Sequence, residues 1–334
     1  MGSLGAVTIS GGVTMTAPTA APPPPAPTGT TKAIFGFGSI SQSPNTYTAI
    51  TNLVSNTGVV ATDTTGVGTA RTGLAAAGYG TDKAIFGYGQ LTGSPNPNTY
   101  TAATNLVSNT GVVATDTTGV GTARLALSAA GYGTDKAIFG YGGDFSAGPV
   151  QYSLTNLVSN TGVVATDTTG VGTARVGSAA AGYGSSGQAI FGYGFYFPPT
   201  ATAITNLVSN TGVVATDTTG VGTARDSVAA AGYGSDKAIF GYGGTDAPAY
   251  YSLTNLVSNT GVVATDTTGV GTARSVLSAA GYGSDKAIFG YGTTGFNTFL
   301  SLTNLVSNTG VVATDTTGVG TARSGLAAAG YSTA

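Results

Sequence analysis

The sequence contains no cysteine, histidine, tryptophan or glutamate, and only 7% of its 334 residues are charged. Without cysteine there are no disulfides and no thiolate metal sites, so stability has to come from packing. The net charge of −2 lacks the basic footprint of nucleic-acid binding. No apolar run approaches the roughly 20 residues that span a bilayer. We therefore expect neither nucleic-acid binding nor membrane insertion.

What the chain does contain is a repeat. The string "TNLVSNTGVVATDTTGVGTAR" occurs six times without a change, and a second block, "AIFGYG" ("AIFGFG" in the first copy), also occurs six times. The arginines that end the string are 49 to 53 residues apart: Arg71, Arg124, Arg175, Arg225, Arg274 and Arg323. Glycine, threonine, valine and tyrosine fill the period, which favours strands and turns over helices.

Each period predicts four short strands. They are "AAAGYG" (as at 75–80), "KAIFGYG" after a tight "TDK" or "SDK" turn, "TNLVS", and "VVATD" after the turn "NTG". Four strands in about 50 residues are typical of one β-propeller blade. No apolar stripe of period 3.6 supports a helical repeat. A β-solenoid is the alternative, although its coils are usually shorter.

The termini are out of phase with the repeat. The first copy starts at Thr30 with "TTKAIFGFG", a second strand without its first, and the chain ends with a first strand, "LAAAGYSTA", without its second. Pairing the two halves completes one blade and leaves no open sheet edge. We therefore predict an all-β fold, a six-bladed β-propeller of four-stranded antiparallel blades over residues 32–334, whose ring is closed by the C-terminal strand pairing with the N-terminal blade.

The order of these motifs resembles the kelch family of β-propellers. In "ARTGLAAAGYGTDKAIFGYG", from Ala70, an arginine precedes a small-residue strand, a turn and an aliphatic-aromatic strand ending in glycines. The resemblance covers about residues 30–334. The string "KAIFGYG…TNLVSNTGVVATDTTGVGTAR" is also similar to kelch-like repeats of bacteriophage structural proteins. This resemblance implies a propeller fold and a location in a virion or outside the cell.

The copies differ in two places only. One is the stretch between "FGYG" and "TNLV", and the other is the three residues after each arginine. In an antiparallel blade both connections leave from the same end, so both variable stretches are predicted on one face. A constant scaffold with one diverse face is a common design for binding. The alternative is drift in unconstrained loops.

Several residues of these stretches are candidates for partner contact, because exposed aromatic rings stack on sugars or anchor protein partners. They are Asp144, Phe145, Phe195, Tyr196, Phe197, Asp246 and Phe296. Four other aromatic residues sit four positions before "TNLV", and this regularity favours strand packing instead: Tyr47, Tyr100, Tyr250 and Phe299.

The charged residues of the constant string form two sixfold sets, the arginines above and six aspartates: Asp63, Asp116, Asp167, Asp217, Asp266 and Asp315. An active site needs an asymmetric group of nucleophile, base and orienting residue. We therefore expect no enzyme and no cofactor. For the aspartates we favour turn capping or an ion pair with the arginine eight residues later, or with the next blade. A cation held by an aspartate ring around a central channel is the alternative.

Residues 1–31 fit no blade. A Gly/Thr/Val part precedes "APTAAPPPPAPTGTT", a semi-rigid polyproline spacer. This layout predicts an anchor and linker that binds other virion proteins; a disordered tail is the alternative. The functional prediction is a non-enzymatic virion surface or appendage protein, such as a tail fibre, whose variable face attaches to host-cell surface glycans or proteins. The alternatives are a structural head or tail decoration protein and a soluble propeller lectin.

Overall fold

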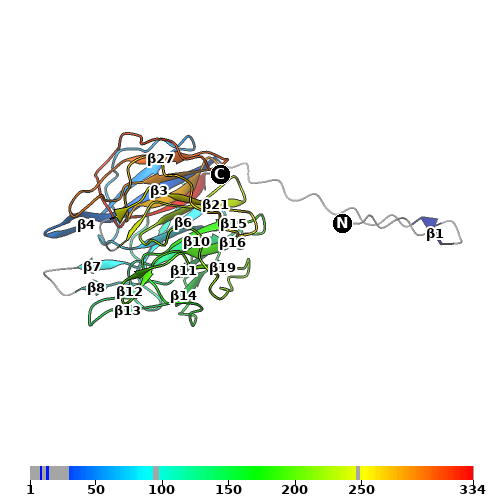
Figure 1. Ribbon diagram of the computed structural model, residues 1–334, viewed down its shortest axis with the longest axis horizontal. Coiled ribbons are helices and arrows are strands. Elements are labelled where there is room, and N and C mark those ends of the chain that lie inside the picture. The colour runs from blue at the N-terminus through cyan, green and yellow to red at the C-terminus, as the bar shows by residue number, and fades with distance from the viewer. Residues whose placement is uncertain (1–7, 10–12, 15–29, 93–97, 246–248, 334) are drawn as a thin grey trace.

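A computed structural model describes residues 8–9, 13–14, 30–92, 98–245 and 249–333 (Figure 1). Within these residues the regular structure is entirely β, with no helix. The strands form six antiparallel three-stranded sheets of equivalent order, together with short two-stranded hairpins in the described part of the chain. Repeated antiparallel sheets of this kind fit a propeller-like fold.

Each three-stranded sheet has an inner, a middle and an outer strand. The inner strands come from "AAAGY" or "SAAGY" and are β5 (Ala75–Tyr79), β10 (Ser128–Tyr132), β15 (Ala179–Tyr183), β20 (Ala229–Tyr233), β25 (Ser278–Tyr282) and β28 (Ala327–Thr333). The middle strands are β6 (Lys83–Gly87), β11 (Lys136–Gly140), β16 (Gln188–Gly192), β21 (Lys237–Gly241), β26 (Lys286–Gly290) and β3 (Thr30–Gln42). The outer strands are β9 (Thr104–Val107), β14 (Thr155–Val158), β19 (Thr205–Val208), β24 (Thr254–Val257), β27 (Thr303–Val306) and β4 (Asn45–Val54).

The core lies between neighbouring sheets. Phe86 of β6 reaches the preceding sheet, where its ring packs edge-on against Phe37 with ring centroids 5.2 Å apart. A Cβ added to Gly36 would lie 2.8 Å from the Phe86 ring, so glycine at this position makes room for the phenylalanine. The same Gly–Phe contact recurs between Gly87 and Phe139. Each fully buried Phe or Ile stabilises the fold by about 1.5–3 kcal/mol.

The predicted fourth strand is not a regular strand. The segment after "NTG" makes two isolated bridges to the outer strand in each copy, such as Val54 to Val60 and Thr51 to Thr64. Between these bridges the outer strand advances three residues and the segment four, which is a bulge. The Asn52 amide fills the gap by donating to the Ala61 carbonyl and to Asp63. The units are therefore three-stranded sheets with an irregular outer edge.

The second predicted strand also ends early. β6 stops at Gly87, because Tyr88 adopts a left-handed backbone with φ of 66°. Five other copies repeat this conformation, with Phe37 in the first. A bulky residue rarely adopts it. The Tyr88 carbonyl accepts a hydrogen bond from Arg71 Nε and its ring lies under the Arg124 guanidinium, which hold this conformation in place.

The two ends of the repeat region are paired. β28 runs antiparallel to β3, with Ala329 opposite Ile34 and Thr333 opposite Thr30. β3 thus begins two residues before the expected boundary at residue 32. Each inner strand packs against the next, and β28 packs against both β25 and β5. Figure 1 draws the first and last colours of the chain, blue and red, together in one region.

Two series of backbone hydrogen bonds link all the sheets. On one side, the backbone N–H of the middle residue of each triplet after an arginine donates to the carbonyl of its counterpart in a neighbouring sheet. The bonds run in the order Gly73, Gly325, Val276, Ser227, Gly177, Ala126 and back to Gly73. On the other side, the residue after each inner strand donates to the turn of the next sheet, for example Gly80 to Asp135 and Gly283 to Thr31. Ser332 donates to Asp82, which continues this second series across the two chain ends.

Before the repeats, β1 (Thr8–Ile9) and β2 (Val13–Thr14) form a hairpin. Figure 1 draws β1 apart from the sheets. The remaining residues of the predicted anchor and linker lie outside the described residues.

Candidate functional site

The first variable stretch of each copy forms a hairpin rather than an open loop. The hairpins are β7 (Gln90–Thr92) with β8 (Thr99–Tyr100), β12 (Gly143–Asp144) with β13 (Val150–Gln151), β17 (Phe195–Tyr196) with β18 (Thr200–Ala201), and β22 (Gly244–Thr245) with β23 (Ala249–Tyr250). In the first copy β3 and β4 continue as a hairpin, and in the last Thr293 bridges Phe299. We call the surface formed by residues 39–50, 90–103, 143–154, 195–204, 244–253 and 293–302 the hairpin face.

The second variable stretch lies beside the first, as predicted. Thr72 bridges Gln90 and Val176 bridges Phe195, which places both stretches of a copy together. The triplets are nevertheless framework rather than display. Their middle residues form the first hydrogen-bond series, and their last residues are buried, as for Leu74 and Val228. The displayed variation is therefore confined to the hairpins.

Neighbouring hairpins are tied to one another. The Tyr100 hydroxyl accepts from the Phe145 backbone N–H at 3.2 Å. Gln151 of β13 bonds the next hairpin with both ends of its amide, donating to the Phe195 carbonyl and accepting from the Phe197 N–H. The Gln42 and Asn297 side chains exchange bonds with each other's backbone across the chain ends. Several hairpins thus form a connected surface.

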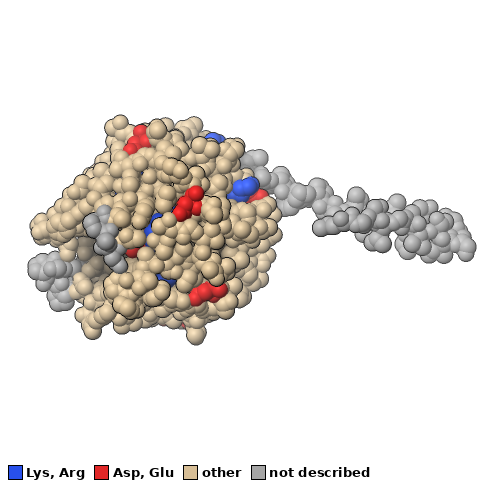
Figure 2. Space-filling model, in the orientation of Figure 1, with Lys and Arg blue, Asp and Glu red and all other residues tan. Residues whose placement is uncertain are grey.

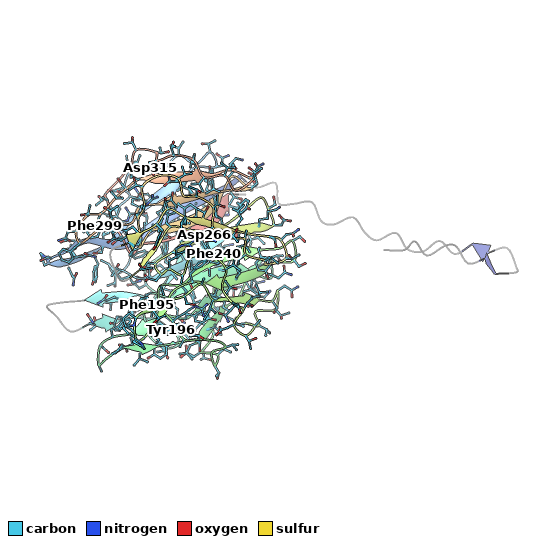
Figure 3. All side chains as sticks on the ribbon, viewed as in Figure 1. Phe195, Tyr196, Phe240, Asp266, Phe299 and Asp315 are labelled. Carbon is cyan, nitrogen blue, oxygen red and sulfur yellow. The ribbon has the colours of Figure 1, made fainter. Side chains whose placement is uncertain are left out.

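Three of the predicted contact residues come together. Phe145 and Phe197 pack edge-to-face with ring centroids 5.9 Å apart, and Phe195 and Phe197 do so at 5.6 Å. We call Phe145, Phe195 and Phe197 the phenylalanine patch. Phe197 is 39% exposed. Figure 3 labels Phe195 and Tyr196 next to each other in the lower half of the view, and Phe299 on its left side.

The other candidates are separate from this cluster. Phe296 is 73% exposed on the last hairpin, far along the sequence from the patch. Asp144 accepts from the Ser146 backbone and hydroxyl, so one oxygen caps its own hairpin. Tyr196 is half-buried in β17. Asp246 lies outside the described residues. Tyr47, Tyr100 and Tyr250 lie in hairpin strands, in agreement with their regular spacing.

The opposite surface, which we call the turn face, consists of the constant turns at 80–82, 133–135, 184–187, 234–236 and 283–285. Four neighbouring Asp–Lys pairs stand here at 2.6–2.7 Å: Asp82 with Lys83, Asp135 with Lys136, Asp236 with Lys237 and Asp285 with Lys286. Thr31, at the start of β3, accepts from Gly283 on this same face. β3 therefore begins at the turn face. Most of the surface drawn in Figure 2 is uncharged, in keeping with the few charged residues.

The arginines and aspartates hold the seams between sheets. Arg175 is fully buried and donates to the carbonyls of Thr173 and Tyr193 and to Asn206 Oδ1, with its guanidinium 4.1 Å from the centre of the Tyr141 ring. The other five arginines repeat these bonds, and Arg323 makes them to Phe37 and Asn52 across the chain ends.

Each aspartate bonds to the preceding copy, and not to the arginine eight residues later in its own copy. Asp217 accepts from the Thr173 N–H and hydroxyl of the preceding copy and from Asn206 of its own. The nearest arginine to an aspartate belongs to the preceding copy, as in Arg71 to Asp116 at 3.5 Å. The alternative of an ion pair with the next blade is therefore confirmed for Arg71, Arg124, Arg225 and Arg274.

Burial and hydrogen bonding act in opposite directions on the pKa values of these arginines and aspartates. Burial lowers the pKa of Arg71 to about 10, against the opposing attraction of Asp116, and Arg71 stays charged at neutral pH. Burial alone would raise the pKa of Asp217. The bonds from Thr173 and Asn206 and the charge of Arg175 outweigh it, so the pKa of Asp217 lies below its ordinary value.

The aspartates do not surround a central channel. The axial space is lined by the inner strands: a cavity of about 400 Å³ on the turn face, and one of about 110 Å³ at the other end. Neither cavity is lined by an aspartate of the constant string. Among the described residues no three His, Cys, Asp or Glu side chains group as a metal site. The cation alternative for an axial aspartate ring is wrong.

The glycines of "AAAGYG" crowd the axial space. A Cβ on Gly78 would lie 3.0 Å from the Gly330 carbonyl, and one on Gly131 3.3 Å from the Gly78 carbonyl. The "GVG" glycines lie elsewhere. Gly172, with φ of 77°, packs against Asn206 and Asp217 at the seam.

Sequence reasoning missed Gln151, Gln42 and Asn297, which join the hairpins. Each occurs in one copy only and belongs to no motif.

No helix in the described part of the chain is long and apolar enough to cross a membrane. Comparison of the chain with protein-family models and with curated proteins gives no match.

Proposed function

We propose that this chain is a non-enzymatic display protein, a closed six-bladed β-propeller held through its N-terminal residues. Its hairpin face would attach to a glycan or protein on a host-cell surface. We further propose, from the resemblance to kelch-like repeats of phage structural proteins, that it belongs to the surface or an appendage of a virion.

The closed ring is supported by two independent hydrogen-bond series. Both return to their starting sheet, and both cross between the last copy and the first. The seam at the chain ends also repeats the bonds of the other seams, with Arg323 donating to Asn52 and Asp63 accepting from Thr321. Six sheets in one cycle correspond to six blades, each lacking a regular fourth strand among the described residues.

The observation that carries the proposal is the opposition of the two faces. The N-terminal segment joins at the turn face, where Thr31 borders the 400 Å³ cavity. The hairpins, the part of the described surface where the copies differ, lie at the other end of the inner strands. A module tethered at one face and varied at the other leaves its varied face free for a partner. The polyproline spacer would hold it away from the anchor.

The proposed absence of catalysis is supported by the structural bonds that the aspartates make. Each aspartate of the constant string accepts bonds that join two sheets, and four more pair with a neighbouring lysine. Carboxylates that make the same structural bonds in six equivalent copies do not form the asymmetric set of nucleophile, base and orienting residue that catalysis needs.

Binding to a glycan array and to isolated envelopes of candidate host cells tests the proposal. Two variants are compared with the full chain: one without Met1–Gly29, and one in which hairpins 91–99, 144–150 and 196–200 are shortened to two-residue turns. Attachment should survive the first change and be lost with the second. Attachment unaffected by hairpin shortening contradicts the proposal.

The same measurements separate the alternatives. A decoration protein would bind virion subunits but neither glycans nor envelopes. A soluble lectin would bind glycans and need no N-terminal segment for its incorporation into any particle. Incorporation of the full chain but not of the Met1–Gly29 deletion into particles supports the virion proposal.

A further inference from the structure

The phenylalanine patch differs from the rest of the hairpin face in being built jointly by two hairpins. Phe145 comes from β12–β13 and Phe197 from β17–β18, and the rings meet edge-to-face. Gln151 fixes the junction by bonding the backbone on both sides of Tyr196. The rings are therefore preorganised, which reduces the entropy lost on binding.

The bordering amide offers little to a sugar. Gln151 uses one N–H and its carbonyl oxygen on the neighbouring hairpin, and the Thr200 hydroxyl donates to the Pro198 carbonyl. Edge-to-face rings also lack the single flat platform on which a pyranose stacks. Apolar contact is offered instead by Phe197, of which 39% is exposed. Such a surface fits an aliphatic or aromatic side chain of a protein.

The charges near the phenylalanine patch indicate which kind of protein segment it binds. Among the described residues of the hairpin face and of the triplets beside it, the charged side chains are those of Asp144 and Asp226, with no lysine or arginine. Asp144 directly precedes Phe145, and Asp226 bridges Gly244 of the hairpin that follows β17–β18. One carboxylate, that of Asp144, therefore belongs to a hairpin that builds the patch, and a second, that of Asp226, stands beside the hairpin that follows it. The lysines stand at the other face, where Lys83 and Lys286 border the large cavity.

Resting on the proposed display function, we propose that the phenylalanine patch docks a basic protein segment that inserts an apolar side chain beside its lysines or arginines. The apolar side chain packs against the exposed ring of Phe197. The cations are attracted by the carboxylates and by the faces of the rings. Because carboxylates on a half-exposed surface act over about 8–10 Å at moderate salt, the binding depends on ionic strength.

A random twelve-residue peptide library selected against the full chain tests this inference. Selected peptides should be enriched in Lys or Arg together with Leu, Phe or Trp. For the tightest peptide, Phe197→Ser should weaken binding at least tenfold, and Asp144→Asn about threefold at low salt with a smaller salt dependence. Phe296→Ser is the matched control, an exposed phenylalanine on another hairpin, and should leave the affinity unchanged. Unaltered thermal unfolding of each variant verifies the fold.

Three outcomes contradict the inference: no enrichment of basic-apolar peptides, binding independent of salt, or equal effects of Phe197→Ser and Phe296→Ser. Failure of the display function is distinguishable from these. If glycans bind the hairpin face and Phe197→Ser has no effect on them, the partner class is wrong while display stands. If hairpin shortening leaves envelope attachment intact, display itself is wrong, whatever the peptides do.

Discussion

At the residue scale, the unusual feature is a fully buried arginine at every seam. Removing a guanidinium from water is costly unless its donors are satisfied. Here carbonyl and amide oxygens satisfy it, an aromatic ring covers it, and the carboxylate stands further off, at 3.5–3.9 Å where it is in range. The arginine therefore acts as a hydrogen-bonding joint between sheets more than as half of an ion pair.

Replacing Arg175 with methionine should lower the free energy of unfolding by about 3–5 kcal/mol. The change fills part of the volume, but it leaves Asn206 Oδ1 and two buried carbonyls without their donors. Urea denaturation followed by circular dichroism measures this. Lys136→Met is the control, because Lys136 is surface-exposed, and its variant should unfold at the unchanged urea concentration. Equal urea midpoints for the two variants would contradict the role of Arg175 as a hydrogen-bonding joint between sheets.

The middle residues of the triplets predict an opposite pair of effects. Val276 and Gly325 are equivalent and both have positive φ, 54° and 61°. A β-branched residue is strained there. Val276→Gly should therefore stabilise the fold or leave it unchanged, whereas Gly325→Val should destabilise it by about 1–2 kcal/mol. Thermal unfolding of both variants checks this; loss of stability in Val276→Gly would show that its side-chain packing outweighs the strain.

The seam aspartates predict the pH dependence of stability. Their folded-state pKa lies below the ordinary aspartate value, as for Asp217. As pH falls, the unfolded chain takes up protons first, so stability is full above about pH 5 and declines through the ordinary range near about 4 and below. With no histidine or glutamate, the curve should be flat from about pH 5 to 7. Urea midpoints across pH 2.5–7 test this, and Asp217→Asn should make the acid decline shallower.

At the element scale, the inner strands are rich in alanine and glycine because they converge. Ala77 lies opposite Ile85, and the larger side chains are carried by the middle strand, where the space between sheets is wider. The hairpins follow the opposite rule. They lie beyond the crowded centre, so their lengths and side chains vary without disturbing the sheets.

Crowding at the inner strands predicts that Gly78→Ala lowers the free energy of unfolding by about 1–3 kcal/mol. The new Cβ would lie 3.0 Å from the Gly330 carbonyl, so two inner strands have to separate. Gly295→Ala is the control, since its nearest neighbour is 3.7 Å from the added Cβ and its φ is not positive. Chemical denaturation of both proteins tests this, and equal stabilities contradict the crowding.

At the scale of the whole molecule, the two chain ends complete one sheet. Its inner strand, β28, and its middle strand, β3, are almost the full repeat region apart in sequence. Pairing of the two ends removes a free sheet edge. In the closed ring that we propose, every seam would depend on the others.

Deleting Ser324–Ala334 should therefore lower the melting temperature of the entire fold and promote aggregation, because the β3 edge is exposed and the bonds from Gly325 and Ser332 are lost. Deleting Met1–Gly29 is the matched control at the other end and should leave melting unchanged. Scanning calorimetry and light scattering measure both. An unchanged melting temperature after the C-terminal deletion contradicts the closed ring.

The sequence by itself determined the all-β class, the period and three of its four strands, because identical strings with glycine punctuation leave few local choices. It also determined the pairing of "LAAAGYSTA" with the strand after Thr30, because two half-units of opposite phase have only each other as partners. Tertiary structure alone decided that the fourth strand bulges around Asn52, that each aspartate serves the preceding copy, and that the last residue of each triplet is buried. It also decided that Phe145, Phe195 and Phe197 meet. The bulge depends on Asn52 bonds to residues only 9 and 11 positions away, which an alternating strand pattern does not reveal. The aspartate bonds to the preceding copy and the junction of the hairpins join residues 43 or more positions apart, which no local pattern encodes.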